Sequence, residues 1–342
     1  MSRRFRFGSV VVTAMRACLL APLGLMAGCA GPALLQQSWP AGTPGMVELS
    51  NTPFYPQQDY QCGPAALATV LSASMQVHGR SVNPEPLVAE VYVPDRRGSL
   101  QPEIVAAARK RGLVVYPIRP TLGDLVAQLV AGQPVLVLQN LGLKSLPVWH
   151  YAVVVGADAS AEELILRSGT VRRRVEQSDD FMRRWSLADR WGIVTLQPGI
   201  LPADPDWPVY LRAVADLEAS GASQAAGRAY QAALAHEPGL VAARFGLANV
   251  RYAQGQLEQA SALYLSLLGD PAYAVSALNN LANVYIDQAC LGDAELALDR
   301  AQSLAGDGSG LRSALASTRE RLLAAIAAAG SARPGFCVEQ GP

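Results

Sequence analysis

The sequence of 342 residues is poor in charge, in histidine and in long apolar runs, and each shortage excludes a class of protein. Charged residues make up 16%, and 28 basic residues balance 28 acidic ones. No basic stretch has the density that phosphate binding needs, so we expect no nucleic-acid partner. Hydrophobic residues make up 50% and only five residues are cysteine, which excludes a disordered chain and a disulfide-dense scaffold. The length suits about two globular domains.

Motifs for metal and cofactor chemistry are also missing. The chain has no phosphate-binding loop of the GxxxxGK[ST] kind, no HExxH, and no spacing of cysteine and histidine suited to zinc. We therefore expect no cofactor and no metal. Only three histidines are available as a base, namely His78, His150 and His236.

The N-terminus is typical of a secreted bacterial protein. Four arginines precede or begin a short apolar run at 17–29, ACLLAPLGLMAGC, which cannot span a bilayer. Its end resembles a lipobox, so we expect residues 1–28 to be a signal peptide and Cys29 to receive diacylglycerol. Ala30 resembles an outer-membrane signal, which predicts a lipid-anchored protein on the periplasmic face of that membrane. The alternative is an ordinary secretory signal cleaved within 27–30.

Removal of the signal peptide changes the charge and the cysteine count. Residues 1–28 carry four arginines and no carboxylates, so the mature chain has a net charge of −4. Cys18 leaves with the signal and Cys29 would be acylated, so three of the five cysteines remain as thiols. An odd number in an oxidising compartment favours one pair and one free group. We expect Cys290 to pair with Cys337 and Cys62 to stay free.

The first half of the chain reads as an α+β domain over residues 49–197. Residues 29–48 are rich in Pro and Gly and are expected to form a tether. Helical spacing predicts helices within 57–75 and at 84–91, 101–110 and 122–132. Short β-branched runs bounded by turn residues predict strands at 113–118, 134–139, 150–156, 163–168, 170–176 and 191–196. Helices followed by an antiparallel sheet are typical of the α+β class.

The second half repeats itself every 34 residues. A Pro-rich linker at 198–208 precedes it. Four sets of equivalent positions, here called ladders, share this spacing. They are Ala226, Ala260 and Ala294; Tyr230, Tyr264 and Leu298; Ala213, Leu247 and Leu281; and Val214, Ala248 and Ala282. This period is that of the tetratricopeptide repeat and makes a generic helical bundle improbable. We expect repeats over 209–330, starting near Trp207, Val241 and Val275, with a capping helix at 311–329 and a tail at 331–342.

Cys62 stands where an extended segment turns into an apolar helix. Pro64 suits the first helical turn, so the thiol lies at the helix N-terminus, where unpaired amides favour a thiolate and lower the cysteine pKa. From its position alone, a small buried hydrophobe is the simpler interpretation. A thiol nucleophile needs a base, and His150, which opens the strand HYAVVVG, is the candidate. The other two histidines are less suitable as a base, because His78 is predicted at a helix end and His236 in a turn of the repeats.

The segments FYPQQDYQCGPAALATVL and WHYAVVVG resemble the papain-like cysteine peptidases of the bacteriocin-leader-processing, double-glycine type, in their stand-alone branch. The resemblance covers roughly residues 48–197. It implies a papain-like fold in which Cys62 attacks a peptide carbonyl and His150 shuttles the proton. It also implies that an upstream glutamine donates to the oxyanion. Gln57 fits this role, although it stands one residue closer to the cysteine than usual, and Gln58 is a rival.

The third group of the resembled family, an aspartate after the histidine strand, is missing. Asp158 lies eight residues beyond His150, about 26 Å along a strand, and cannot orient the ring. If the hairpin turns within 158–162, the return strand brings Ser168 and Thr170 beside His150 on the same face. We expect Ser168 to orient the imidazole, or no third group to exist. Without a charged partner, a slow peptidase and an inactive relative both become credible.

Together these features predict a lipid-anchored envelope protein with a thiol peptidase domain and a repeat array. The substrate would be a peptide or protein, and the repeats would hold substrate or a protein partner. One alternative is a weak or inactive peptidase-like adaptor that uses the cleft and the repeats for binding. A second is acyl transfer to an amine, or amidation chemistry on peptidoglycan peptides, because the same dyad serves transferases. Residues 172–174, three arginines, are expected to form a solvated strand face.

Overall fold

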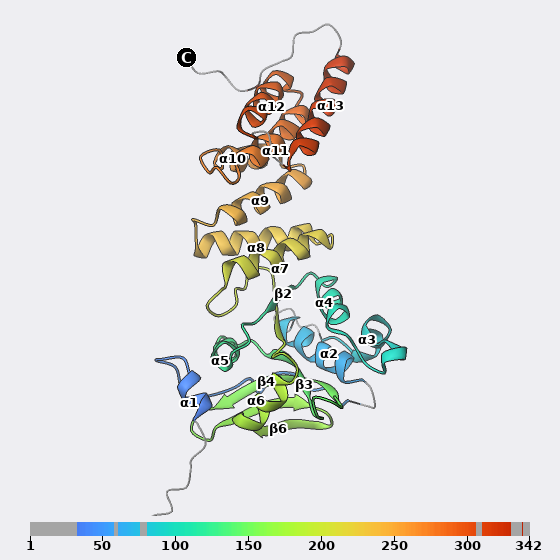
Figure 1. Cartoon of the computed structure of the whole chain (residues 1–342), viewed down its shortest axis with the longest axis vertical. Coiled ribbons are helices and arrows are strands. Elements are labelled where there is room, and N and C mark those ends of the chain that lie inside the picture. Colours follow the sequence, from blue (N-terminus) through green and yellow to red (C-terminus); the bar gives the residue numbers. More distant parts are fainter. Residues whose placement is uncertain (1–32, 58–60, 76–80, 306–309, 330–336, 338–342) are drawn as a thin grey trace, which may run out of the picture. The chain divides into compact units, whose positions relative to one another are not determined.

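The computed structural model describes residues 33–57, 61–75, 81–305, 310–329 and 337. An α+β domain comes first and a helical array follows it, as Figure 1 shows. Both the mixed domain and the helical array confirm the predicted fold class. The predicted signal peptide, Cys29, Gln58 and His78 lie outside the described residues.

A seven-stranded antiparallel sheet forms the centre of the first domain. Its order is β2-β7-β3-β4-β5-β6, and β1 pairs with the end of β4. The strands are β1 (Met46–Glu48), β2 (Val114–Pro117), β3 (Val135–Asn140), β4 (Trp149–Asp158), β5 (Glu163–Ser168), β6 (Val171–Gln177) and β7 (Gly192–Leu196). The ends of the six predicted strands lie within two residues of those observed. Short runs of Val, Ile and Leu buried on both faces explain why β2, β3, β5 and β7 were recognisable, whereas β6 is almost entirely exposed.

Helices cover both faces of the sheet. On one face, α2 (Cys62–Met75), α3 (Pro84–Val91) and α4 (Gln101–Arg109) share an apolar core with the odd-numbered residues of β4. On the other face, α1 (Leu34–Ser38), α5 (Leu122–Val130) and α6 (Ser178–Ser186) pack against the even-numbered ones. Helix α2 is apolar on all sides and is buried from Gly63 to Ser72. That burial fixes where Cys62, its first residue, lies.

Two segments differ from expectation. The tether predicted for 29–48 is wrong over α1 and β1, because both are packed. Leu35 is fully buried, and its N–H donates to the Glu162 carboxylate at 2.9 Å. Strand β1 pairs with β4, Met46 lying opposite Asp158. Helix α6 was not predicted at all.

In the described residues after 206, seven helices form the array: α7 (Trp207–Ala219), α8 (Ser223–His236), α9 (Val241–Ala253), α10 (Leu257–Leu265), α11 (Ala274–Asp287), α12 (Leu291–Ala305) and α13 (Arg312–Ala329). The first helices of the repeats begin at Trp207, Val241 and Ala274, as the 34-residue period predicts to within one residue. Small residues let the helices approach: a Cβ at Gly246 would lie 2.7 Å from Tyr230 Cε1.

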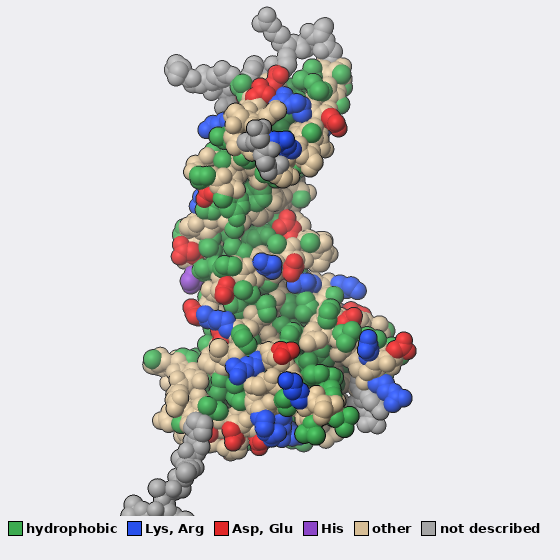
Figure 2. Space-filling view, in the orientation of Figure 1, with side chains coloured by type: hydrophobic (Ala, Val, Ile, Leu, Met, Phe, Trp, Pro, Cys, Tyr) green, Lys and Arg blue, Asp and Glu red, His purple; other side chains and the backbone are tan. Residues whose placement is uncertain are grey.

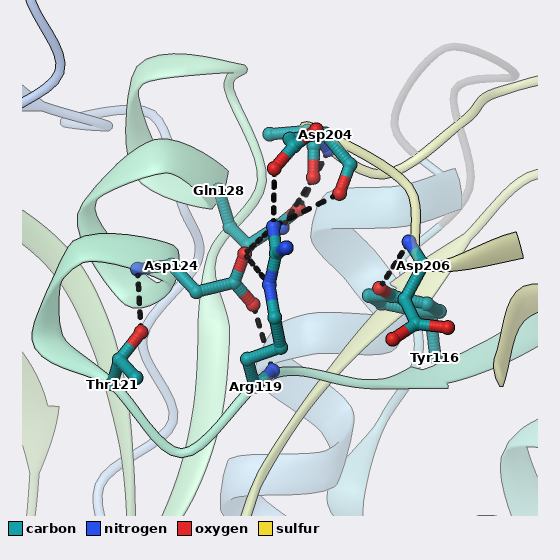
Figure 3. A network of polar contacts seen from close by, with 8 residues as sticks. Tyr116, Arg119, Thr121, Asp124, Gln128, Asp204 and Asp206 are labelled. Atoms are coloured by element: carbon teal, nitrogen blue, oxygen red, sulfur yellow. Dashed lines mark hydrogen bonds and ion pairs between the residues drawn. The ribbon is translucent and has the colours of Figure 1, made fainter.

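Polar contacts tie the linker to the first domain (Figure 3). The Arg119 guanidinium binds Asp124 at 3.1 Å and Asp204 at 2.6 Å, and the Tyr116 hydroxyl accepts from the Asp206 N–H at 3.1 Å. The apolar core also continues across the linker, since Tyr116 of β2 lies against Tyr210 of α7 with ring centroids 6.4 Å apart. The first repeat thus shares its core with the sheet.

The cysteines are arranged as expected. Cys290 and Cys337 form a disulfide, and Cys62 is free. Among the described residues, one group has metal-ligand geometry, and it consists of these two bonded cysteines with Asp293. Since both sulfurs are in the disulfide, this group is not a metal site. No helix in the described parts of the chain is long and apolar enough to cross a membrane.

Candidate active site

The Cys62 thiol lies at the start of α2, half-buried against the sheet. Three backbone N–H groups lie close enough to its sulfur to lower its pKa, those of Tyr151, Gly63 and Cys62. The last two belong to the open end of α2, where amides have no helical partner. The first belongs to the peptide bond that joins His150 to Tyr151. The thiol is therefore adjacent to the backbone of the predicted base.

The pKa of the Cys62 thiol is shifted in the opposite direction to the prediction. Burial raises the pKa of Cys62 above its ordinary value, although the three backbone N–H groups act in the opposite direction. The expectation of a lowered pKa is wrong, because removal of the sulfur from water outweighs the helix N-terminus. Without substrate the protein holds a thiol at neutral pH, not a thiolate.

His150 is the second residue of β4, and Ser168 is the last of β5. The β4–β5 hairpin pairs Val153 with Arg167, a register that brings the two side chains to one face of the sheet. His150 Nε2 lies 2.9 Å from the Oγ of Ser168, which is buried. Thr170 lies in the β5–β6 turn. The structure thus brings together the histidine and the serine that the sequence paired.

A buried ionic network lies beside the imidazole. The Glu176 carboxylate is 6% exposed and binds Arg174 at 2.8 Å and Arg184 at 3.0 Å. It also accepts from Gln139 Nε2 at 3.3 Å. The pKa of His150 is lowered to about 4, chiefly by burial and also by the charge of Arg174, while Glu176 acts in the opposite direction. The imidazole is therefore neutral at pH 7.

Sequence reasoning missed this network. Glu176 and Gln139 come from β6 and β3, and only the sheet order shows that they meet. In the sheet, Gln139 pairs directly with His150. Without knowledge of the strand order, however, that pairing could not be deduced.

Thiol and imidazole lie on two sides of one peptide group. Side chains alternate along β4, so Tyr151 points towards α2 while His150 points towards Ser168. Among the described residues, no hydrogen bond joins the Cys62 sulfur to the His150 ring. Since Ser168 takes Nε2, the ring nitrogen left for the thiol is Nδ1.

Gln57 ties the segment before α2 to the sheet. Its N–H donates to Gly169 O at 3.0 Å, and its Oε1 accepts from Gly169 N at 3.1 Å. Its Nε2 donates to Tyr151 O at 3.3 Å. An amide nitrogen carries two hydrogens, so one N–H remains for another acceptor. Gln57 therefore fixes the turn after Ser168 and the backbone after His150 at once.

The other sequence candidates lie elsewhere. Asp158 accepts from the N–H groups of Ser160 and Ala161 and so caps the β4–β5 turn, far from the ring as expected. His236 ends α8 and contacts Trp207, with ring centroids 5.4 Å apart.

The arginine run on β6 forms an exposed strand face, as predicted. In the space-filling view, basic side chains lie over the region where Figure 1 places α6 and β6 (Figure 2). Arg173 of this run pairs with Glu48 at 3.0 Å.

Tyr151 lies beside the thiol and contacts residues of two other segments. Its hydroxyl donates to Ser99 O at 3.2 Å, and its ring meets Trp191 edge to face at 5.9 Å. Ser99 lies just before α4 and contacts Gly63, since a Cβ at Gly63 would be 2.5 Å from Ser99 Cβ. The start of α2 is therefore held between β4 and the segment that leads into α4.

Two segments of this chain match models of known families. Residues 52–188 match the model of the Peptidase C39 family, and residues 217–272 match that of the tetratricopeptide repeat. A crystal structure of a C39-like peptidase from Bacillus anthracis is 19% identical, with a TM-score of 0.37, and the match covers 44% of this chain and 98% of that one. None of the curated proteins matches significantly. Residues 52–188 of this chain are thus similar to the Peptidase C39 family, and residues 217–272, which follow them, are similar to the tetratricopeptide repeat.

Proposed function

We propose that the chain is a cysteine peptidase that cleaves peptide bonds with Cys62 and His150. The carrying observation is the placement of the thiol against the N–H of the residue that follows His150, while Ser168 holds the far ring nitrogen. The family match of residues 52–188 supports the same reaction class.

The reaction starts from a neutral pair. In the tautomer that donates from Nε2 to Ser168 Oγ, Nδ1 of His150 carries the lone pair that accepts the thiol proton. The sulfur attacks the substrate carbonyl, and the protonated ring then gives its proton to the leaving amine. Water, deprotonated by the same ring, hydrolyses the thioester and releases the acid. Because the resting pair is neutral, the ion pair forms only along the reaction.

The oxyanion would receive hydrogen bonds from the Cys62 backbone N–H and from the second N–H of Gln57. One such donor is worth about 3 kcal/mol in the transition state. Gln57→Ala should therefore lower kcat by about 100-fold. Ser168 orients the ring but carries no charge, which suits a slow enzyme.

A thiol-reactive peptide probe tests the proposal on the full chain. Labelling at Cys62, absent in Cys62→Ala and at least tenfold slower in His150→Ala, is the expected result. His236→Ala serves as the matched control, because that ring lies on α8 and contacts Trp207. Equal labelling rates in wild type and His150→Ala would remove the base from the mechanism.

One observation favours a second candidate, a binding adaptor without turnover. The thiol pKa is raised, the imidazole pKa is lowered, and no hydrogen bond between described residues joins the two groups. An adaptor would bind a peptide equally well in wild type and Cys62→Ala and would form no product. Product analysis by mass spectrometry, with and without an added amine, separates hydrolysis, acyl transfer and simple binding.

The repeats, the lipid anchor and the location complete the proposal. Tetratricopeptide repeats commonly bind peptides in their groove, so the array is proposed to recruit a substrate or a protein partner. Lipidation at Cys29 and the periplasmic face of the outer membrane rest on the N-terminal sequence alone. Mass spectrometry of the mature N-terminus tests the first, because a diacylglyceryl cysteine at position 29 has a distinctive mass.

A further inference from the structure

A hairpin beside the candidate active site exposes an unusual number of apolar side chains. Residues 141–149 connect β3 to β4 and end one residue before His150. Fourteen large apolar side chains are exposed in the described parts of the chain, and five of them lie within these nine residues: Leu141, Leu143, Leu146, Val148 and Trp149. Leu143 is 68% exposed and Leu146 72%. Such a concentration indicates a surface that binds something.

The hairpin has a defined shape that keeps these side chains outside. Buried Asn140 accepts from the N–H groups of Gly142 and Val148, both at 2.9 Å, and donates to Leu143 O. The backbones of Leu143 and Leu146 exchange hydrogen bonds of 3.1 and 3.2 Å. Because the loop is hydrogen-bonded along its length, its leucines are presented to solvent and do not fold inward.

The position of the hairpin points to the substrate as its occupant. Trp149 directly precedes His150, and the Cys62 sulfur faces the N–H of the next residue, Tyr151. A peptide whose carbonyl reaches the sulfur must therefore pass this end of β4. Residues 141–149 contain a single charged residue, Lys144, so the surface suits an uncharged, apolar side chain.

A membrane fits this surface less well. The first described residues bind at the opposite end of β4, where Met46 pairs with Asp158 and the Leu35 N–H binds Glu162. Ten residues of strand separate the two ends by about 30 Å. A lipid attached upstream of residue 33 would be joined to the domain at the end that lacks the hairpin.

We propose that the β3–β4 hairpin, residues 141–149, binds large apolar side chains of the peptide substrate next to the scissile bond. This inference rests on the proposed peptidase function and names its substrate class. Leu143 and Leu146, the two most exposed members, carry the contact, and Trp149 forms its boundary towards His150.

A random peptide library tests the preference with the full chain. Cleavage products identified by mass spectrometry should show Leu, Ile, Met or Phe enriched within three residues of the cleaved bond. The double variant Leu143→Asn/Leu146→Asn should lose this enrichment and cleave the best apolar peptide at least tenfold more slowly. The control is Ile200→Asn, which changes an exposed apolar residue of the linker outside the array and should keep it. Unchanged cleavage in the hairpin variant overturns the proposal.

Binding without turnover separates this inference from the proposed function. The immobilised Cys62→Ala chain is incubated with the same library, and retained peptides are sequenced. Retention of apolar peptides that the added hairpin substitutions abolish supports the hairpin surface even if wild type cleaves nothing. Equal retention by both variants overturns it. So does hairpin-dependent binding to phosphatidylethanolamine–phosphatidylglycerol vesicles, or hairpin-dependent dimerisation in sedimentation, because another occupant would then cover the patch.

Discussion

A serine hydroxyl holds His150 in this protein, where a carboxylate would stabilise the charged ring more strongly. Burial and the charge of Arg174 act in the same direction on the ring, and the pKa of His150 is lowered to about 4. The base is thus available at pH 7, but its protonated form is costly. Both properties depend on single side chains, so each can be altered by one substitution.

Ser168→Asp should raise the pKa of His150, because an adjacent carboxylate favours the imidazolium. The acid limb of kcat/KM should move to higher pH, and the rate above that limb should increase. NMR titration of the His150 ring measures the shift directly. Ser168→Ala is the control, since it removes the hydroxyl without adding charge. A pKa in Ser168→Asp that stays at the wild-type value contradicts the assigned contact.

Folding stability should fall as the pH drops from about 6.5 to about 4. The unfolded chain binds a proton at His150 near pH 6.5, while the folded chain binds it only near pH 4. The contribution is fully present above 6.5 and is lost below 4, and it amounts to about 2–3 kcal/mol for this half-buried ring. Urea unfolding across this range in wild type and His150→Gln isolates it. Parallel pH curves for the two proteins would refute the assignment.

At the scale of elements, the start of α2 depends on the absence of a side chain at Gly63. A Cβ there would overlap Ser99, which precedes α4. Gly63→Ala should therefore push α2 away from α4 and cost about 1–3 kcal/mol of unfolding free energy. Ser99→Gly should restore most of this loss, because it removes the clashing atoms.

Gly45→Ala is the matched control for that experiment, since a Cβ added at Gly45 would meet no atom within 4 Å. Urea unfolding of wild type, the two single variants and the double variant gives the coupling free energy. Additive effects of Gly63→Ala and Ser99→Gly would show that the two positions do not contact each other.

Most elements could be predicted because their signals are local. The 34-residue ladders define the repeats, and strand alternation brings Ser168 to the face of His150. Helix α6 was not predicted, because its sequence is largely charged. Phe181 and Trp185, which are spaced by four residues, form its buried face. The sign of the Cys62 pKa shift could not be predicted, since burial depends on how α2 packs against the sheet. Glu176 was missed for a similar reason, because its partners come from distant segments.

At the scale of the whole molecule, the disulfide ties Cys337 back to the start of α12, 47 residues earlier. Such a bond limits the freedom of the unfolded chain. Cys337→Ser should lower the unfolding free energy of the array by about 2–4 kcal/mol. Urea unfolding with and without a reductant checks this on wild type. A reductant that also shifts Cys337→Ser would point to another cause.

The first domain should not be stable without the first repeat. Tyr116 of β2 packs on Tyr210, and Val214 and Leu217 belong to the same core as the sheet. A chain ending at residue 206 should expose this apolar face and aggregate. A chain ending at residue 272 keeps two repeats and should remain monomeric in size-exclusion chromatography. A monomeric short chain with an unchanged melting temperature would contradict the shared core.

The shared core also bears on how such chains could be recombined. The Pro-rich linker looks like a natural site for exchanging one repeat array for another, yet a crossover there would separate Tyr116 from Tyr210. A crossover beyond the first repeat leaves that contact intact. A transplantable module of this protein would therefore comprise the sheet, its covering helices and α7–α8, while the later repeats could be exchanged for others.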